Sequence, residues 1–121
     1  MSRSLLALAA LHGFLAVAFG AFAAHGVDDV AAKGWLETGA RYEALHAVAA
    51  LVLTSLPVRF ARVAGWLFIA GAALFAFSLY ALAFGAPRAT GMITPLGGVA
   101  LLGGWGALLV GALTTGTEKT P

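Results

Sequence analysis

Apolar residues fill most of this chain, in four long runs separated by short stretches that carry charges, Pro or Gly. The runs cover approximately residues 4–24, 39–56, 63–84 and 93–114. A helix needs about 20 mostly apolar residues to cross the hydrocarbon core of a bilayer, and each run approaches or reaches that length. The pattern therefore predicts an all-α fold in which residues 1–121 form a single integral membrane bundle of four transmembrane helices.

The connections between the runs predict how the helices are joined. Residues 57–62 read as a tight basic turn, and residues 85–91 as a turn bounded by Gly and Pro. Short connections make neighbouring helices antiparallel, so the chain is expected to run up and down through the bundle.

The segment between the first two runs is longer and patterned. Its apolar positions recur at helical spacing, while Asp28, Asp29, Lys33 and Glu37 fall largely on the other side. This pattern predicts a short amphipathic helix on the membrane surface between spans 1 and 2, with Asp28 or Asp29 near its N-terminal end and Trp35 as an interfacial anchor. The alternative is one continuous helix that runs into the second span.

The composition supports the membrane interpretation. Hydrophobic residues make up 61% of the chain and charged residues 10%, and the mean hydropathy is +0.95. A soluble domain of this length would present more charge to water. The basic residues behind the net charge of +2 are scattered singly, so no nucleic-acid surface is expected. The chain has no cysteine, which excludes disulfides, Cys-ligated zinc and thiol nucleophiles.

The distribution of Lys and Arg predicts the orientation in the membrane. Four spans place both termini on one side, together with the turn at residues 57–62. That side would carry Arg3, Arg59, Arg62 and Lys119, against Lys33, Arg41 and Arg88 on the other. Because Lys and Arg favour the cytoplasmic side, both termini are expected to be cytoplasmic, in the cell inner (plasma) membrane.

Small residues line one face of two runs and predict where helices touch. The fourth run carries Gly97, Ala100, Gly104, Ala107 and Gly111 at steps of three and four, and the first run carries Ala9, Gly13, Ala16, Gly20 and Ala24 in the same manner. Lipid is as apolar as a leucine side chain, so close contact across small residues is what holds membrane helices together.

Few ionisable side chains lie inside the runs, and each one is a candidate functional residue because a charge in a membrane is costly. His12 is expected to point into the bundle, as a possible intramembrane relay. Glu43 and His46 are three residues apart, which puts them on one helix face. On an antiparallel hairpin, a polar cluster is expected near the outer leaflet, and its members are His25, Arg41, Tyr42, Glu43 and His46.

Several roles for this cluster stay open. In the first, Arg41 pairs with Glu43 or with lipid phosphate, and the histidines tie helices together through hydrogen bonds. Others are a proton or ion relay through His12, Glu43 and His46, metal or haem ligation that adds His25, and the binding of a lipid headgroup or quinone. The sequence has no phosphate-binding loop, dinucleotide fingerprint or catalytic triad, so no catalytic residue, metal or cofactor is expected.

Four segments in order give the chain a family resemblance. They are residues 20–26, residues 35–47 with Arg41, Tyr42 and His46, residues 77–80, and residues 94–98 with Gly104 and Trp105. Together they resemble the domain-of-unknown-function 423 family, small membrane proteins that include YgdD-like and transmembrane protein 256-like members. The resemblance implies four spans and no established activity. It departs at Ala23, where the family usually has Gly, and at Glu43, where it usually has Gln, which weakens any mechanism that requires the carboxylate.

Two classes of function follow. The favoured one is a non-enzymatic structural or accessory membrane component, whose partners are the lipid bilayer and either further copies of itself in a homo-oligomer or a larger membrane complex. The alternative is a small transporter, channel or cofactor-binding protein that uses the His/Glu cluster. An enzyme acting on a lipid or quinone is the third option.

Overall fold

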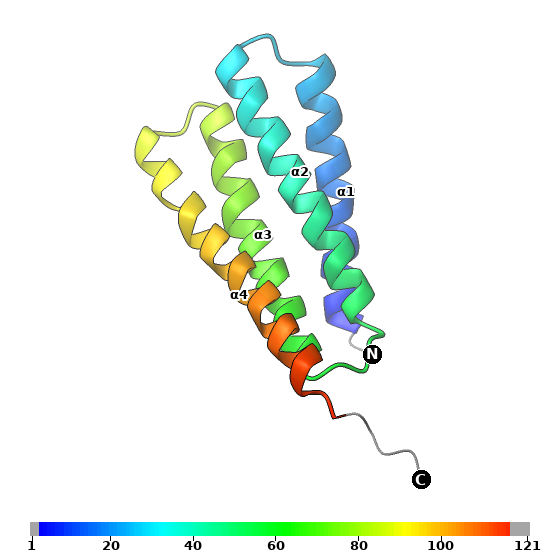
Figure 1. The fold of residues 1–121 in the computed structure, drawn as a ribbon. Coiled ribbons are helices and arrows are strands. Elements are labelled where there is room, and N and C mark those ends of the chain that lie inside the picture. Colours follow the sequence, from blue (N-terminus) through cyan, green and yellow to red (C-terminus); the bar gives the residue numbers. More distant parts are fainter. Residues whose placement is uncertain (1–2, 117–121) are drawn as a thin grey trace.

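The computed structural model describes residues 3–116 and shows an all-helical chain (Figure 1). Its elements are α1 (Arg3–His25), α2 (Val30–Leu53), α3 (Ala61–Ala83), the short 3-10 helix η1 (Arg88–Met92) and α4 (Thr94–Thr114). The all-α expectation is confirmed, and the first, third and fourth runs begin and end within two residues of α1, α3 and α4. Lys119, which entered the orientation argument, lies outside the described residues.

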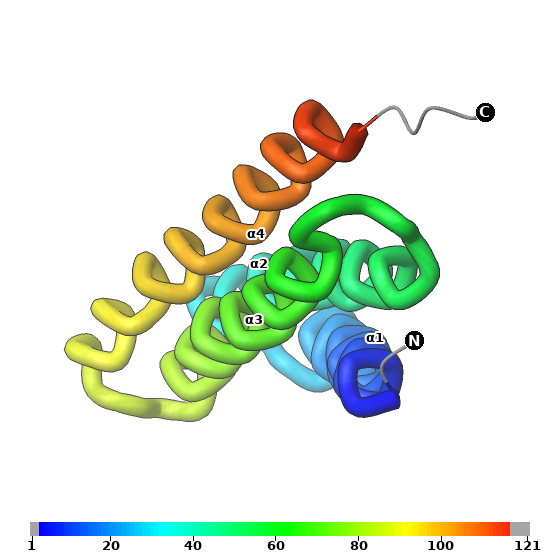
Figure 2. The backbone as a smooth tube through the Cα atoms, turned by 90° about the horizontal axis from the view of Figure 1, so that it is seen from below, coloured from blue at the N-terminus to red at the C-terminus, as the bar shows by residue number. Residues whose placement is uncertain are grey.

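The helices pack in the order in which they occur in the chain. α1 packs mainly on α2, α2 on α3, and α3 on α4, while α1 touches α3 much less. Figure 2 shows the consequence: α1 and α4 lie at opposite edges of the molecule, with α2 and α3 between them. The two inner helices therefore hold most of the buried residues, including Phe68 and Ala72 of α3 and Ala50 of α2.

Successive helices run in opposite directions, so the two ends of the molecule are built from different segments. The N-terminal end of α1, the α2–α3 connection and the C-terminal end of α4 lie together at one end (Figure 1). The α1–α2 connection and η1 lie at the other. This is the antiparallel order expected from the short connections.

Within residues 3–116, three helical segments are long and apolar enough to cross a membrane: Arg3–His25, Ala61–Ala83 and Arg88–Thr114. α2 is of similar length but is not among them. It carries Lys33, Glu37, Arg41 and Glu43, which lower its mean hydropathy.

The separate surface helix expected between spans 1 and 2 is wrong, because α2 is a single helix from Val30 to Leu53. Asp29 caps it, and its side chain accepts a hydrogen bond from the Ala32 backbone at 2.9 Å. No strong helix breaker follows, and Leu36, fully buried, packs in a cluster with Tyr80 and other residues of α1 and α3.

Small residues bring α4 against α3, as the stripe on the fourth run predicts. Gly97, Gly104 and Gly111 are all buried. A Cβ at Gly97 would collide with the backbone nitrogen of Phe75, and one at Gly104 would lie 2.6 Å from the Phe68 ring. The stripe on α1 is only partly used, because a Cβ at Gly13 would meet nothing within 4 Å.

Candidate functional site

Glu43 is the centre of a buried polar network that joins three helices. It lies on α2 and is 0% exposed. Its Oε2 atom lies 2.6 Å from Nδ1 of His12 on α1, and its Oε1 atom accepts a hydrogen bond of 2.7 Å from the Tyr80 hydroxyl on α3. His12 and Tyr80 are themselves buried, at 4% exposure each. Both carboxyl oxygens are thus engaged, each by a different neighbouring helix.

His12 and Glu43 are close enough to share a proton across their 2.6 Å contact. If the two groups share one ionisable proton, the pair is either an imidazolium with a carboxylate or an imidazole with a carboxylic acid, and both forms are electrically neutral overall. A net charge in this position would be expensive because it is removed from water. The Tyr80 hydroxyl adds a donor from α3, so the three side chains form a compact hydrogen-bonded tie between α1, α2 and α3.

His46 belongs to a second, separate network. Its Nδ1 atom lies 2.7 Å from the Tyr42 carbonyl oxygen, and its Nε2 atom lies 2.9 Å from the indole nitrogen of Trp105 on α4. An indole N–H can only donate and a carbonyl can only accept. These partners therefore require the neutral tautomer of His46 with the proton on Nδ1, and they leave neither ring nitrogen free to bind a metal or pass on a proton.

The five-residue cluster expected near the outer leaflet does not assemble as a unit. Glu43 and His46 are both buried on α2, yet they contact different helices, because a step of three residues also turns the side chain partly around the helix. His25 and Arg41 are exposed, and in residues 3–116 no hydrogen bond or ion pair joins them to Glu43 or His46.

The metal or haem set of His25, Glu43 and His46 is not formed either. No group of three or more His, Asp or Glu side chains in the described part of the chain is placed to hold a metal ion. His12 points into the bundle as expected, since this residue is buried and contacts Glu43.

Two residues of these networks were not recognised from the sequence. Tyr80 is buried and donates to Glu43. Trp105 donates to His46. A hydroxyl or indole group amid apolar residues needs a hydrogen-bond partner, and this requirement is the signal that could have found them.

Ser78 makes one hydrogen bond within its own helix and a second one to α4. Its hydroxyl donates to the Phe75 carbonyl oxygen at 3.0 Å and lies 2.5 Å from the Thr94 hydroxyl at the start of α4. Because the Ser78 proton is used within α3, Thr94 is the donor between the two hydroxyls. This bond ties α3 to α4 at the end next to η1.

A groove of about 510 Å³ opens between α2 and α4, and Phe75 of α3 also lines it. Its wall is mostly apolar, and His46 and Trp105 bridge it with their hydrogen bond. Tyr42 lines the same groove, is 42% exposed, and packs its ring 4.6 Å from that of Phe75. The groove thus offers aromatic and aliphatic surface, and its one imidazole is already occupied by partners.

The family model and the individual relatives found by comparison with known proteins point to the same family. Residues 19–98 match the family model described as "Protein of unknown function (DUF423)". The chain is 42% identical over 118 residues to a UPF0382 membrane protein of Haemophilus influenzae, covering 93% of this chain and 95% of the relative. It is 41% identical over 121 residues to the UPF0382 inner membrane protein YgdD of Escherichia coli K12, covering 93% and 91%.

A more distant relative is the UPF0382 membrane protein YwdK of Bacillus subtilis, 38% identical over 114 residues, with 88% of this chain and 93% of the relative covered. No solved structure matches the chain. The family match covers most of the chain, from the middle of α1 to the first turns of α4, and includes Glu43, His46 and Tyr80. The chain belongs to the DUF423 family of small membrane proteins of unknown function.

Proposed function

We propose that this protein is a non-enzymatic structural or accessory component of the cell inner membrane. The observation that carries the proposal is the pairing of its polar groups. In residues 3–116, no buried side-chain nitrogen or oxygen lacks a hydrogen-bond partner. The side chains best suited to proton transfer or metal binding are those of Glu43, His12 and His46. All three are engaged in hydrogen bonds between helices, so they stabilise the bundle and do not form a reactive surface.

We also propose that all four helices span the bilayer, with both termini in the cytoplasm. The antiparallel contact of α2 with α1 and α3 over its length supports a fourth span. Of its four charged residues, Glu43 is buried inside the protein, and Lys33 and Glu37 lie within two turns or so of its start. Arg41 is exposed and lies about three turns from that start, and its long side chain can extend toward the membrane surface. A helix of 24 residues is about 36 Å long, which exceeds the apolar thickness of a bilayer.

The accessory role is supported by the surface of the edge helices. α4 packs mainly on α3, and its outward residues Leu96, Leu102 and Leu113 are 62–77% exposed. Beside it lies the apolar groove that α2 and α4 enclose. Such a face is available for a second copy or for another membrane protein, which fits the homo-oligomer or complex subunit expected from the sequence.

The test is the state of the protein after gentle extraction. Purified in a mild detergent, the protein is expected to run as a defined oligomer or to bring down a stoichiometric membrane partner, measured by light scattering and native mass spectrometry. Cross-linking in native membranes, before detergent is added, checks that the association exists in the bilayer. A monomer in both measurements would refute the accessory role.

A second candidate is a proton relay, and the 2.6 Å contact of His12 with Glu43 is the observation that favours it. A pair that shares one proton can exchange it, provided that water reaches it. Proteoliposomes with an internal pH dye test this: a relay gives acidification that Glu43→Gln abolishes. Proton flux that is absent from the wild-type protein would eliminate this candidate and leave the accessory role untouched.

A further inference from the structure

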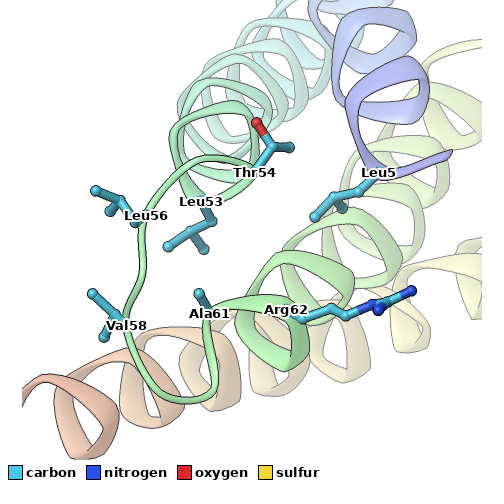
Figure 3. A pocket seen from close by; sticks show the side chains of 7 residues that line it. All are labelled: Leu5, Leu53, Thr54, Leu56, Val58, Ala61 and Arg62. Carbon is cyan, nitrogen blue, oxygen red and sulfur yellow. The ribbon is translucent and has the colours of Figure 1, made fainter. Parts of the chain in front are cut away.

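A hollow at the end that holds the start of α1 and the α2–α3 connection is distinct from both polar networks. It encloses about 340 Å³ between the start of α1, the end of α2, the α2–α3 connection and the start of α3 (Figure 3). Figure 3 shows Leu5 and Arg62 on one side of the space and Leu56 and Val58 on the other, with Leu53 and Thr54 between them on the α2 side.

The hollow has a closed floor and a charged rim. Leu5, Leu53 and Ala61 form the floor, at 2%, 5% and 6% exposure. Leu56 lines the outer wall and is 41% exposed, so it offers open apolar surface beside the hollow. Arg62 also lines the hollow and is exposed. An exposed leucine wall with a guanidinium at the edge of the hollow suits an amphiphile with an anionic head.

The surrounding charge strengthens that match. Arg3 begins α1 and Arg59 lies in the α2–α3 connection, so both lie at the same end as Arg62. No carboxylate of the described residues balances them there. Asp28 and Asp29 lie in the opposite connection, Glu37 lies in the part of α2 near that connection, and Glu43 is paired in the interior. This end is therefore uniformly positive in residues 3–116.

The start of α3 adds to the positive potential. Its N-cap residue, Phe60, makes no side-chain hydrogen bond to the helix and has a φ of 67°. The positive end of a helix dipole favours an anion nearby. Here it acts beside Arg62, the second residue of α3, and supports the same preference without being needed for it.

We propose that this hollow binds one anionic phospholipid of the surrounding membrane. The guanidinium of Arg62 contacts the lipid phosphate, and an acyl chain lies along the wall formed by Leu56 and Val58. Arg3 and Arg59 favour an anionic head over a zwitterionic one by their field, at a membrane surface where each basic residue contributes about 1 kcal/mol. The site is separate from the proposed accessory role, because it uses none of the polar residues that join the helices by hydrogen bonds and none of the groove between α2 and α4.

The experiment uses full-length protein in a neutral detergent, titrated with dioleoyl phosphatidylglycerol, dioleoyl phosphatidylcholine or inorganic phosphate. Native mass spectrometry counts the bound lipid, and the melting temperature reports stabilisation. Phosphatidylglycerol is expected to bind with a stoichiometry of one and to raise the melting temperature. Arg62→Gln should weaken that affinity about fivefold, the loss that one basic residue near the surface implies. Arg88→Gln is the matched control, since Arg88 is an exposed arginine in η1 at the opposite end.

Each other outcome overturns the proposal. Equal binding of phosphatidylglycerol and phosphatidylcholine would remove the anionic selectivity. Stabilisation by inorganic phosphate alone, at the same strength, would indicate a free-phosphate site and not a lipid site. If Arg62→Gln and Arg88→Gln lost equal affinity for phosphatidylglycerol, the effect would depend only on the net charge of the protein and not on this hollow. Because Arg62 is exposed, Arg62→Gln should melt like the wild-type protein without lipid, which shows that it folds.

Discussion

At the scale of single residues, the polar side chains inside this protein are defined by their partners on other helices. Glu43 accepts from Tyr80 and contacts His12, while His46 donates to the Tyr42 carbonyl and accepts from Trp105. In a bilayer, no water replaces a lost partner, so removing one member leaves the others unsatisfied. The same geometry can be met by a neutral amide at position 43, because Gln offers one acceptor and two donors.

Glu43→Gln and Glu43→Ala should therefore differ in stability. Gln can accept from Tyr80 and donate to His12, so its free energy of unfolding should stay close to the wild-type value. Ala leaves two buried groups without a partner and should cost about 1–3 kcal/mol. Unfolding in mixed detergent micelles with increasing dodecyl sulfate measures both. Equal destabilisation by Gln and Ala would show that the carboxylate itself is required.

At the scale of elements, the contact of α3 with α4 depends on glycine at particular positions. Gly97 faces the α3 backbone at Phe75, and Gly104 faces the Phe68 ring. Neighbouring Gly98 is only partly buried, and a Cβ there would meet nothing within 4 Å. Substituting each of the two adjacent glycines therefore distinguishes the effect of close packing, present only at Gly97, from the effect of helix propensity, present at both.

Gly97→Ala is expected to destabilise the protein by about 1–3 kcal/mol, because the added methyl group forces α3 and α4 apart. Gly98→Ala adds the same methyl group in open space and should be neutral or slightly stabilising, since Ala favours a helix more than Gly does. The same dodecyl sulfate titration compares them. If both variants were equally stable, the close approach of α4 to α3 at Gly97 would be wrong.

α2 gives a second prediction at this scale, since it is one helix where a surface helix was expected. Val30 and Val48 are exposed by 85% and 60%, and the chain has no cysteine, so both positions accept spin labels cleanly. Over 18 residues a continuous helix rises about 27 Å. Double electron–electron resonance in lipid vesicles should give one distance distribution around that backbone separation. A much shorter distance would indicate a bend between a surface segment and a span.

At the scale of the whole molecule, the antiparallel order places Arg3, Arg59 and Arg62 at one end, without a described carboxylate to balance them. The other end carries Asp28, Asp29 and Arg88, so its charges are mixed. This asymmetry is larger than the count of Lys and Arg alone indicates, and it follows from how the helices are joined. It underlies both the proposed orientation and the proposed lipid site.

Single cysteines test the orientation and the number of spans together. Asp28→Cys and Ala89→Cys should react with a membrane-impermeant maleimide in intact spheroplasts. Ser55→Cys, in the α2–α3 connection, should react only after permeabilisation, because the basic end faces the cytoplasm. The reversed pattern would invert the orientation. Labelling of Asp28→Cys and Ser55→Cys from the same side would mean that α2 does not cross.

Much of the fold could be predicted from local features. The lengths of the apolar runs predicted α1, α3 and α4. α4 begins at Thr94, with Pro95 in its first turn, where proline is tolerated. The buried glycines of α4 followed from their spacing on one helix face. For α2, the charged residues near its start led to the prediction of a separate surface helix, and the prediction failed because Leu36, which lies among them, is buried against α1 and α3.

The sequence by itself determined that the chain is helical, apolar enough for a membrane and a member of its family, because hydrophobic run length and helix breakers act over a few neighbouring residues. Only the tertiary structure decided that Glu43 belongs with His12 and Tyr80, and His46 with Trp105. Such pairings depend on how each helix is rotated about its axis and which helices touch. Both are set by contacts between residues that are far apart in the chain.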